Sequence, residues 1–508
     1  MSLLRVPSVG LELELPVASR HDGSDADARA ALRTLFARRQ QGEISTEWLA
    51  GEDGNFIGVR SPWGLSGIDN GFNNLETAFD PLIVRHDQAL NRLARVVSTE
   101  LAELSEALES VDAFIVNLAE HPLAGTAQAR YARLRGPRRI YDHWVDTRGW
   151  NHAAGIDAKA QNGPTTGISP ADAVEALNLV LLAAPAFIAL HANSPFENGR
   201  ATGYKENRLR LWPRMFASAK NPADLRLCVP PTAAFEDLGD YFRWMFAPDT
   251  QMHAIPIDGM DYKRSTRLAE VEGQVCLLEF LAGGPRTARC THEGTLHTVQ
   301  PSLHHLEHMQ FAQFLDARVR FELVHFPPAS TFLDALKQPG GIEALFSDIA
   351  RFCYIEGRAA GNTLADMTLL EEAGEDVGAA AALSASALQK GLLNAPEAWR
   401  RLSNAVAWPL IPGLREAAMR DGLQGTHGGM SVRALCEHVL ALAESGLPHS
   451  EQWMLGYARH VLNTNTSAAD HALRFVKCFD GNQRDALAAL VMHRRLVLTT
   501  PPVKTETE

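Results

Sequence analysis

Residues 9–15 read VGLELEL, a short stretch in which leucines alternate with two glutamates. Successive side chains of a β-strand point to opposite faces, so the leucines share one face while Glu12 and Glu14 share the other. Two carboxylates about 7 Å apart repel by roughly 2 kcal/mol at an effective dielectric near 20, and by much less in open water. The pair is therefore either solvated on the wet face of an edge strand or held by cations.

The segments that follow alternate between helix and strand patterns. Residues 24–41 and 81–120 carry apolar residues at helical spacing. Between them, NFIGVR, GLSGI and NNLETAF are separated by turn residues and predict a meander of three strands. Further strands are expected at residues 152–161, in QVCLLEFL and in RVRFELVHF. Because regular βαβ spacing is missing, the pattern favours an α+β fold with an antiparallel sheet over a doubly wound one.

The chain changes character beyond about residue 330, where it becomes rich in Ala, Leu and Glu. We expect an α+β domain over residues 1–330, a mainly helical C-terminal region packed on it over residues 331–500, and a polar tail over residues 501–508. The apolar stretch at residues 173–192 is long enough to cross a membrane, but Glu175, Asn178 and Pro185 interrupt it. It predicts a buried helix kinked near the proline, and no membrane contact.

Composition and motifs exclude several classes of partner. The net charge of -12, from 48 Lys and Arg against 60 Asp and Glu, gives no basic surface for nucleic acid. The six cysteines form no C-x-x-C pair and the first residues lack a signal-peptide pattern, so we expect reduced thiols and a cytoplasmic protein. There is no P-loop motif and no G-x-G-x-x-G opening a helix, so any nucleotide would bind by other means.

The short motif HHLEH offers a zinc site. His304, Glu307 and His308 satisfy H-x-x-E-H, in which two histidines on a helix hold zinc and the glutamate activates water. Such a protease needs a further acidic ligand downstream, and Glu371 and Glu372 are available. The alternative is an ordinary polar helix turn in a chain with 19 histidines.

A third candidate is the stretch ANSPFENGRATGYKENRLRLW at residues 192–212, directly after the apolar segment. It combines a turn and a tryptophan with several arginines: Asn193, Ser194, Pro195, Arg200, Arg208, Arg210 and Trp212. Arginine forks bind carboxylate or phosphate through two parallel hydrogen bonds, so the stretch indicates an anionic ligand. A solvated helix start explains the same residues equally well.

Together these stretches resemble the glutamate-cysteine ligases (γ-glutamylcysteine synthetases) of plants and many bacteria, a family related in fold to glutamine synthetase. The family opens with a G-x-E-x-E strand, matched by Gly10, Glu12 and Glu14, and its meander has an acidic residue at the position of Glu76. Its A-N-S-P-F segment is matched letter for letter, followed by Gly203, Arg208 and Trp212. A later block corresponds to HLEHMQFAQFLDARVRFELV, with Glu322 at the acidic position.

The resemblance implies an antiparallel, glutamine-synthetase-like sheet and an ATP-dependent ligase that joins glutamate to cysteine through an acyl phosphate, as in glutathione biosynthesis. It implies Mg²⁺ or Mn²⁺ as the cofactor, with ATP, glutamate and an amine such as cysteine as small-molecule substrates, and a monomer or homodimer. Residues 1–330 would form the catalytic domain. The implied metal ligands are Glu12, Glu14, Glu76 and Glu322, the catalytic residues Arg208 and His305, and the substrate-binding residues Asn193, Ser194, Gln161, Arg200 and Trp212.

The chain departs from the family pattern in several places. Asn74 replaces the meander glutamine, Val324 stands where the family has an arginine, Gln161 matches only within a one-residue ambiguity, and residues 122–150 align poorly. Three interpretations therefore stay open: a ligase for cysteine, the same chemistry with another amine or acid, and a catalytically inactive relative that binds nucleotide or amino acid. Since a histidine followed by leucine belongs to the family at this point, the zinc protease becomes a remote alternative.

Overall fold

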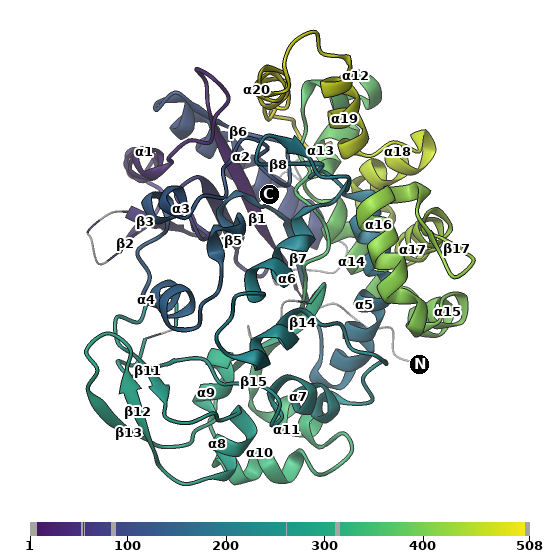
Figure 1. The fold of residues 1–508 in the computed structure, drawn as a ribbon. Coiled ribbons are helices and arrows are strands. Elements are labelled where there is room, and N and C mark those ends of the chain that lie inside the picture. Colours follow the sequence, from purple (N-terminus) through teal and green to yellow (C-terminus); the bar gives the residue numbers. More distant parts are fainter. Residues whose placement is uncertain are drawn as a thin grey trace.

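A computed structural model describes residues 8–51, 54, 56–82, 88–260, 262–309 and 315–502. Its centre is an antiparallel sheet, which confirms the expected α+β class (Figure 1). Within the described residues the sheet has nine strands: β1 (Val9–Ser19), β2 (Glu47–Ala50), β3 (Phe56–Ser61), β4 (Gly64–Ile68), β5 (Asn74–Phe79), β6 (Ala113–Ile115), β7 (Asn162–Gly167), β14 (Ala317–Leu323) and β15 (Ala350–Gly357). Their order is β14-β15-β7-β1-β5-β4-β3-β2, and β6 pairs with the end of β1.

Strand β1 contains VGLELEL and lies in the interior of this sheet, between β5 and β7. The edge-strand interpretation is therefore wrong, although the alternation is as expected: the leucines are buried, and Glu12 and Glu14 are half-buried on the opposite face. Gly10 shares the glutamate face, where an added Cβ would lie 2.5 Å from Thr165 Oγ1 of β7. A side chain here would require Thr165 to move, which gives the first position of G-x-E-x-E a packing reason.

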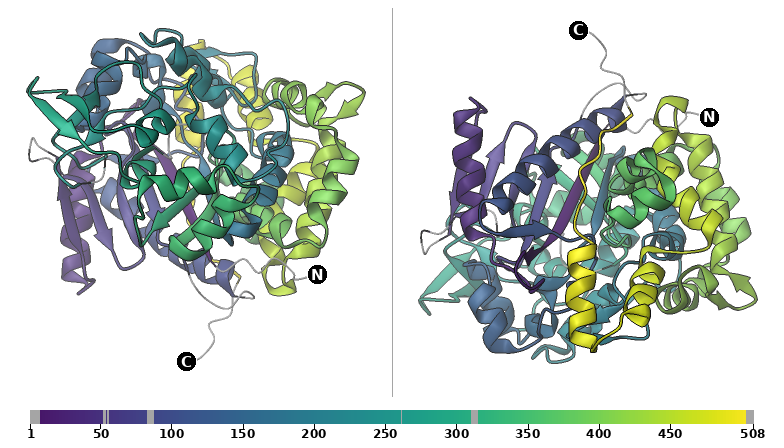
Figure 2. Two further views of the ribbon diagram at one scale, coloured as in Figure 1. Left: turned by 90° about the horizontal axis from the view of Figure 1, so that it is seen from below. Right: turned by 90° about the horizontal axis from the view of Figure 1, so that it is seen from above.

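Helices cover the leucine face of the sheet, and the buried leucines of β1 belong to the same apolar core as these helices. The covering helices are α1 (Arg29–Gln41) on β3, α2 (Ala89–Glu109) on β1 and β6, α5 (Ala173–Leu190) on β14 and β15, and α14 (Ser384–Asn394) on β7 and β1. In Figure 2, α1 and α2 lie toward one end of the sheet and the green helices of the C-terminal part toward the other. Helix α5 is apolar enough to span a membrane, but 94% of its most apolar window is buried inside the protein, as in a core helix.

The segments between the main strands also form a smaller sheet and several short helices. They are β10 (Ile255–Pro256), β11 (Leu268–Val271), β12 (Arg286–Cys290), β13 (Leu296–Val299), α3 (Gln128–Leu134), α4 (Arg139–Asp142), α6 (Leu211–Phe216), α7 (Leu238–Phe246), α8 (Leu277–Ala282) and α9 (His304–Met309). Two strand expectations fail here. QVCLLEFL is helix α8, because Cys276 and Glu279 form a capping box that starts a helix. Residues 152–161 are short helical turns, since Gly155 at φ 102 breaks the extended backbone.

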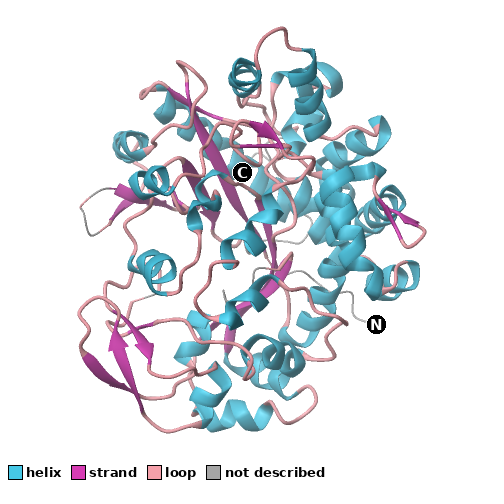
Figure 3. Ribbon diagram, in the orientation of Figure 1, coloured by secondary structure: helices cyan, strands magenta, loops and turns pink. Residues whose placement is uncertain are grey.

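The C-terminal part is helical, as expected (Figure 3). Its helices are α10 (Ala329–Ala335), α11 (Gly341–Ile349), α12 (Met367–Ala373), α13 (Glu375–Ala381), α15 (Ala398–Ala405), α16 (Ile411–Asp421), α17 (Val432–Gly446), α18 (Gly456–Thr464), α19 (Ala468–Cys478) and α20 (Gln483–His493). The expected boundary at residue 330 does not separate these helices from the sheet, because β15 inserts between β14 and β7. Of the expected polar tail, residues 503–508 lie outside the described residues.

Candidate active site

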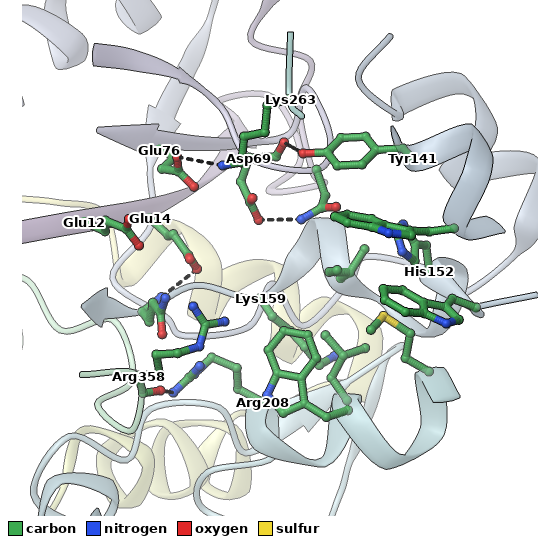
Figure 4. A pocket seen from close by; sticks show the side chains of 18 of the residues that line it. Glu12, Glu14, Asp69, Glu76, Tyr141, His152, Lys159, Arg208, Lys263 and Arg358 are labelled. Carbon is green, nitrogen blue, oxygen red and sulfur yellow. Dashed lines mark hydrogen bonds and ion pairs between the residues drawn. The ribbon is translucent and has the colours of Figure 1, made fainter. Parts of the chain in front are cut away.

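A pocket opens on the glutamate face of the main sheet, with about 960 Å³ of empty space that includes open solvent. In Figure 4 the acidic residues Glu12, Glu14, Asp69 and Glu76 lie on one side of the pocket, and Tyr141 and His152 lie across from them. The acidic lining is Glu12, Glu14, Asp69 and Glu76; the basic lining is Lys159, Arg208, Lys263, Arg318, Arg320 and Arg358; the aromatic lining is Tyr141, Trp144, Trp150, His152, Trp212 and Tyr262. Acidic, basic and aromatic side chains together suit a set of anionic substrates of which one carries an apolar group.

Three of the acidic side chains converge. The pairing of β1 with β5 places Glu14 directly opposite Glu76, and Asp69 follows the end of β4. One oxygen from each lies within 4.8 Å of the others, and within the described part of the chain no other group of three metal-binding side chains is so close. Sequence reasoning missed Asp69, because an aspartate in the DNG turn after GLSGI serves equally well as a plain turn residue.

The pKa values of Glu12 and Glu14 in this site are raised above the ordinary value of a glutamate. Burial, followed by the charges of Glu356 and Glu76, raises the pKa of Glu12 to about 7. Burial, Asp69 and Glu76 raise the pKa of Glu14 well above its ordinary value. Closely spaced carboxylate oxygens are the donors that Mg²⁺ and Mn²⁺ prefer, so the residues fit the expected ion. The role of Glu12, Glu14 and Glu76 as metal ligands stays a prediction.

Stability without divalent cations should depend on pH in a definite direction. Because the folded-state pKa of Glu12 is about 7 against an ordinary 4.5, its contribution to stability is lost as the pH rises through 7. Between pH 6 and pH 8 this amounts to roughly 1 kcal/mol from Glu12 alone. Mg²⁺ binds the deprotonated carboxylates, so it should raise the thermal midpoint more at pH 8 than at pH 6. Thermal unfolding at both pH values, with and without Mg²⁺, measures this; an equal rise at both would contradict it.

The basic side of the pocket is built around a buried carboxylate, Glu356 of β15. Arg318 of β14 donates to Glu356 from Nε and Nη2, both at 2.9 Å, and Arg358 Nη1 donates to it at 2.7 Å. Against its burial, these arginines and Arg320 hold the pKa of Glu356 far below the ordinary value. The position of Val324, where the family has an arginine, is 42% exposed and outside the pocket lining. Arg318 and Arg320 of β14, and Arg358 directly after β15, supply guanidinium groups to the pocket.

The ANSPF segment (residues 192–196) helps to hold Arg208 in position through hydrogen bonds. Ser194 Oγ accepts from the Arg208 backbone N–H at 3.0 Å. Glu206 accepts from the Asn193 backbone N–H and from Arg208 Nε, both at 3.0 Å. Asn193 and Ser194 are buried and do not line the pocket, whereas Arg208 does. The two residues therefore position an arginine instead of shaping the pocket wall, which corrects the expectation of direct substrate binding.

Two further expected residues do reach the pocket. Gln161 lines it, and its backbone N–H donates to Glu14 Oε2 at 3.0 Å. Trp212, on α6, also lines it, with the Arg358 guanidinium carbon 5.7 Å from the centre of its ring. Their roles in substrate binding stay predictions.

Three expected site residues lie elsewhere. Glu322 is exposed and pairs with Arg351 at 3.1 Å, so the expectation that it joins the acidic group is wrong. It stands opposite Phe352, whereas β7 accompanies β15 only along Tyr354–Glu356; Glu322 therefore lies beyond the end of the pocket.

The other two are also corrected. His305 is buried on α9, with Nε2 3.1 Å from the Gln300 carbonyl oxygen and its ring 5.3 Å from Phe280, and it does not line the pocket. Its position is explained by packing between α8 and α9. Arg200 is exposed in a hairpin formed by β8 (Phe196–Glu197) and β9 (Arg200–Ala201). Both expectations of a direct role in the pocket are therefore wrong.

The HHLEH segment does not assemble a protease site within the described residues. His304 Nε2 and His308 Nε2 are 3.0 Å from each other, and Glu307 accepts from the Leu323 backbone N–H at 2.6 Å. Glu372 instead lies 3.3 Å from His471, a residue of α19. Glu371 and Glu372, the two downstream carboxylates that the sequence offers, both lie on α12, and Glu372 is engaged with a C-terminal helix.

Known proteins resemble this chain in sequence and in fold. The model of glutamate-cysteine ligase family 2 (GCS2) matches residues 8–252. A glutamate-cysteine ligase from Francisella tularensis, solved in complex with AMP, has a TM-score of 0.50 at 11% identity, covering 97% of this chain and 89% of that one. This likeness supports the same fold.

Two more distant structures also match. A bifunctional glutathione synthetase from Pasteurella multocida has a TM-score of 0.44 at 12% identity, covering 96% of this chain and 52% of that one. The complex of the prokaryotic ubiquitin-like protein Pup with its ligase PafA has a TM-score of 0.40 at 10% identity, covering 99% of this chain and 79% of that one. No curated protein sequence matches the chain at a significant level.

Proposed function

We propose that this protein, whose residues 8–252 match the model of glutamate-cysteine ligase family 2, is an ATP-dependent carboxylate-amine ligase that forms a γ-glutamyl amide. The family match supports the ligase chemistry, and the γ-glutamyl product is the finer part of the proposal. One observation supports assigning the reaction to this pocket. Oxygens of Glu14, Asp69 and Glu76 lie within 4.8 Å of one another, and four arginines line the same pocket. Acidic metal donors facing guanidinium groups suit a reaction between anions.

The proposed reaction has two steps. A glutamate γ-carboxylate oxygen attacks the γ-phosphorus of ATP, giving an acyl phosphate and ADP. The amine nitrogen then attacks the acyl carbon, loses a proton, and expels inorganic phosphate as the amide forms. Every reacting group before the amine is anionic, so charge repulsion makes a large part of the barrier.

The residues of the pocket divide this task. Glu14, Asp69 and Glu76, with Glu12 beside them, would hold Mg²⁺ or Mn²⁺, which when bound would offset the charge of the ATP phosphates. Arg320 and Arg358 also line the pocket and would hold a substrate carboxylate or phosphate. Arg208, positioned by Ser194 and Glu206, would add a third cationic group. ATP, glutamate and an amine would be the only partners required; monomer or homodimer, and a cytoplasmic location, stay predictions.

A phosphate-release assay distinguishes the three interpretations of the sequence. The protein is incubated with ATP, Mg²⁺, glutamate and one member of a panel of amines that includes cysteine. We expect release that requires both glutamate and an amine, because the acyl phosphate forms only with the acid and is discharged only by the amine. Phosphate release with glutamate and cysteine, but with no other amine of the panel, supports the cysteine ligase. Release with glutamate and another amine supports a related ligase. No release with any pair would contradict the proposal and favour an inactive binding protein.

One observation favours an acceptor amine other than cysteine. Residues 122–150, which align poorly with the family, contribute Tyr141, Trp144 and Trp150 to the pocket lining. This part of the pocket lining therefore comes from a segment in which the chain departs from the family pattern. The acceptor amine is the substrate whose identity this difference would change.

A further inference from the structure

The HHLEH segment assembles no protease site, but it brings two imidazole rings into contact. His304 and His308 are four residues apart on α9, so their side chains are neighbours on one face of the helix. Their Nε2 atoms are 3.0 Å apart, and the two ring planes are nearly perpendicular, at 88°. Neither histidine lines the pocket on the main sheet. Any role of this pair is therefore separate from the proposed ligase reaction.

Neighbouring side chains fix the orientation of both rings. His308 is 7% exposed, so packing around α9 holds its ring in place. The His304 ring meets Phe326 edge to face, with ring centres 5.2 Å apart. The side chain of His304 is nevertheless 47% exposed, so the pair lies at the surface and not in the core. Two ligands that are already in position bind an ion at a low cost in side-chain entropy.

A carboxylate stands next to the more exposed ring. Glu307 Oε2 is 3.9 Å from Nδ1 of His304, the ring nitrogen that does not contact His308. A negative charge there favours the tautomer that carries its proton on Nδ1, which leaves the lone pair of Nε2 for a metal ion. Glu307 Oε1 also accepts from the Leu323 backbone N–H, so the same side chain links the pair to the end of β14.

We propose that His304 and His308 bind one divalent transition-metal ion of tetragonal preference, such as Ni²⁺ or Cu²⁺, with Glu307 as the outer carboxylate. With metal–nitrogen bonds of about 2.1 Å, nitrogens 3.0 Å apart subtend an angle of about 90° at the ion. Tetragonal sites have this angle, whereas tetrahedral zinc needs nitrogens about 3.4 Å apart. No other described His, Cys, Asp or Glu side chain completes a group of three here, so water takes the remaining positions.

A calorimetric titration with Ni²⁺ in excess Mg²⁺ tests this site, because Mg²⁺ prefers oxygen ligands and leaves imidazole to Ni²⁺. We expect the unmodified protein to bind Ni²⁺ at one site more than His304→Phe does. His304→Phe keeps a ring beside Phe326 but removes one ligand, so the affinity of this site should fall by about 100-fold or more. Glu307→Gln keeps an acceptor for Leu323 and removes only the charge, so the affinity should fall by about tenfold.

His21→Phe is the matched control, because it makes the same change at a histidine whose side chain is 79% exposed and stands beside Asp112. Its Ni²⁺ affinity should be unchanged. An equal loss in His21→Phe would assign the binding to scattered surface histidines and overturn the site. An unchanged affinity in His304→Phe, or no Ni²⁺ binding by the unmodified protein, would overturn it as well.

The two histidine changes are at exposed side chains, and the thermal midpoint without metal confirms that each variant is folded. If His304→Phe fails to fold, the tenfold loss expected in Glu307→Gln decides the point. The titration needs neither ATP nor an amine. Failure of the proposed ligase function would therefore leave this inference standing, and loss of the Ni²⁺ site would leave the ligase standing.

Discussion

Replacing Glu76 with glutamine is expected to reduce ATP turnover by on the order of 10³-fold, the largest loss from any single change in the acidic group. Glu76 stands opposite Glu14 in the β1–β5 pairing and supplies one of three converging oxygens. Glutamine has the same shape but no charge, and it binds a divalent cation far more weakly. Phosphate release in the presence of Mg²⁺, glutamate and an active amine measures the loss, and the thermal midpoint reports whether the fold is kept.

Glu322→Gln is the matched control for this experiment. It is the same chemical change at the other acidic position that the family resemblance singled out, but Glu322 is exposed and pairs with Arg351. We expect its activity to stay within about twofold of the unmodified protein, because an exposed ion pair contributes little. Near-normal activity in Glu76→Gln, or an equal loss in Glu322→Gln, would show that the acidic group was assigned to the wrong carboxylates.

The glutamates of β1 show how much of the site the sequence could predict. The two-residue period placed Glu12 and Glu14 on one face, and this is correct because the alternation is a local property of the strand. Whether that face is solvated depends on β5 and β7, which come from residues 74–79 and 162–167. Their position beside β1 is a matter of sheet order, and no local pattern in VGLELEL contains it.

The same limit explains the error at Glu322. In RVRFEL the alternation puts Arg318, Arg320 and Glu322 on one face of β14, and a pocket on that face could use any of them. The structure uses the arginines, because β7 accompanies β15 only next to their end of the strand. Which end of a strand reaches a site is decided by its neighbours. The periodicity of the strand itself carries no such information.

The aromatic lining was beyond sequence reasoning for a different reason. Tyr141, Trp144 and His152 lie on α4, a short π-helix (His143–Thr147) and a 3₁₀ turn (His152–Ala154). Elements of three to five residues leave no periodic signal, and a tryptophan in such a stretch is as typical of a core as of a pocket. Their positions follow from packing against α6, which the sequence places some sixty residues later.

Arg320→Met is expected to lower kcat/KM by about 100-fold, with the loss appearing mainly as a higher KM for glutamate or ATP. Arg320 lines the pocket, and its Nε lies 3.8 Å from Glu356 Oε2, too far for a hydrogen bond, and makes none to any other described residue. A buried guanidinium nitrogen of this kind suits a substrate carboxylate or phosphate. Steady-state kinetics with each substrate varied in turn identify which anion it holds.

The fold should survive this change, because the buried Glu356 keeps its bonds to Arg318 and Arg358 when Arg320 is removed. Arg351→Met is the matched control: Arg351 pairs with the exposed Glu322 beyond the pocket, so its loss should leave both KM values within about twofold. If Arg320→Met leaves both KM values unchanged, β14 contributes no substrate contact, and the anion must be held by Arg208, Arg358 or Lys263. If both variants lose activity equally, the loss comes from the overall charge of the edge of the sheet and not from a contact inside the pocket.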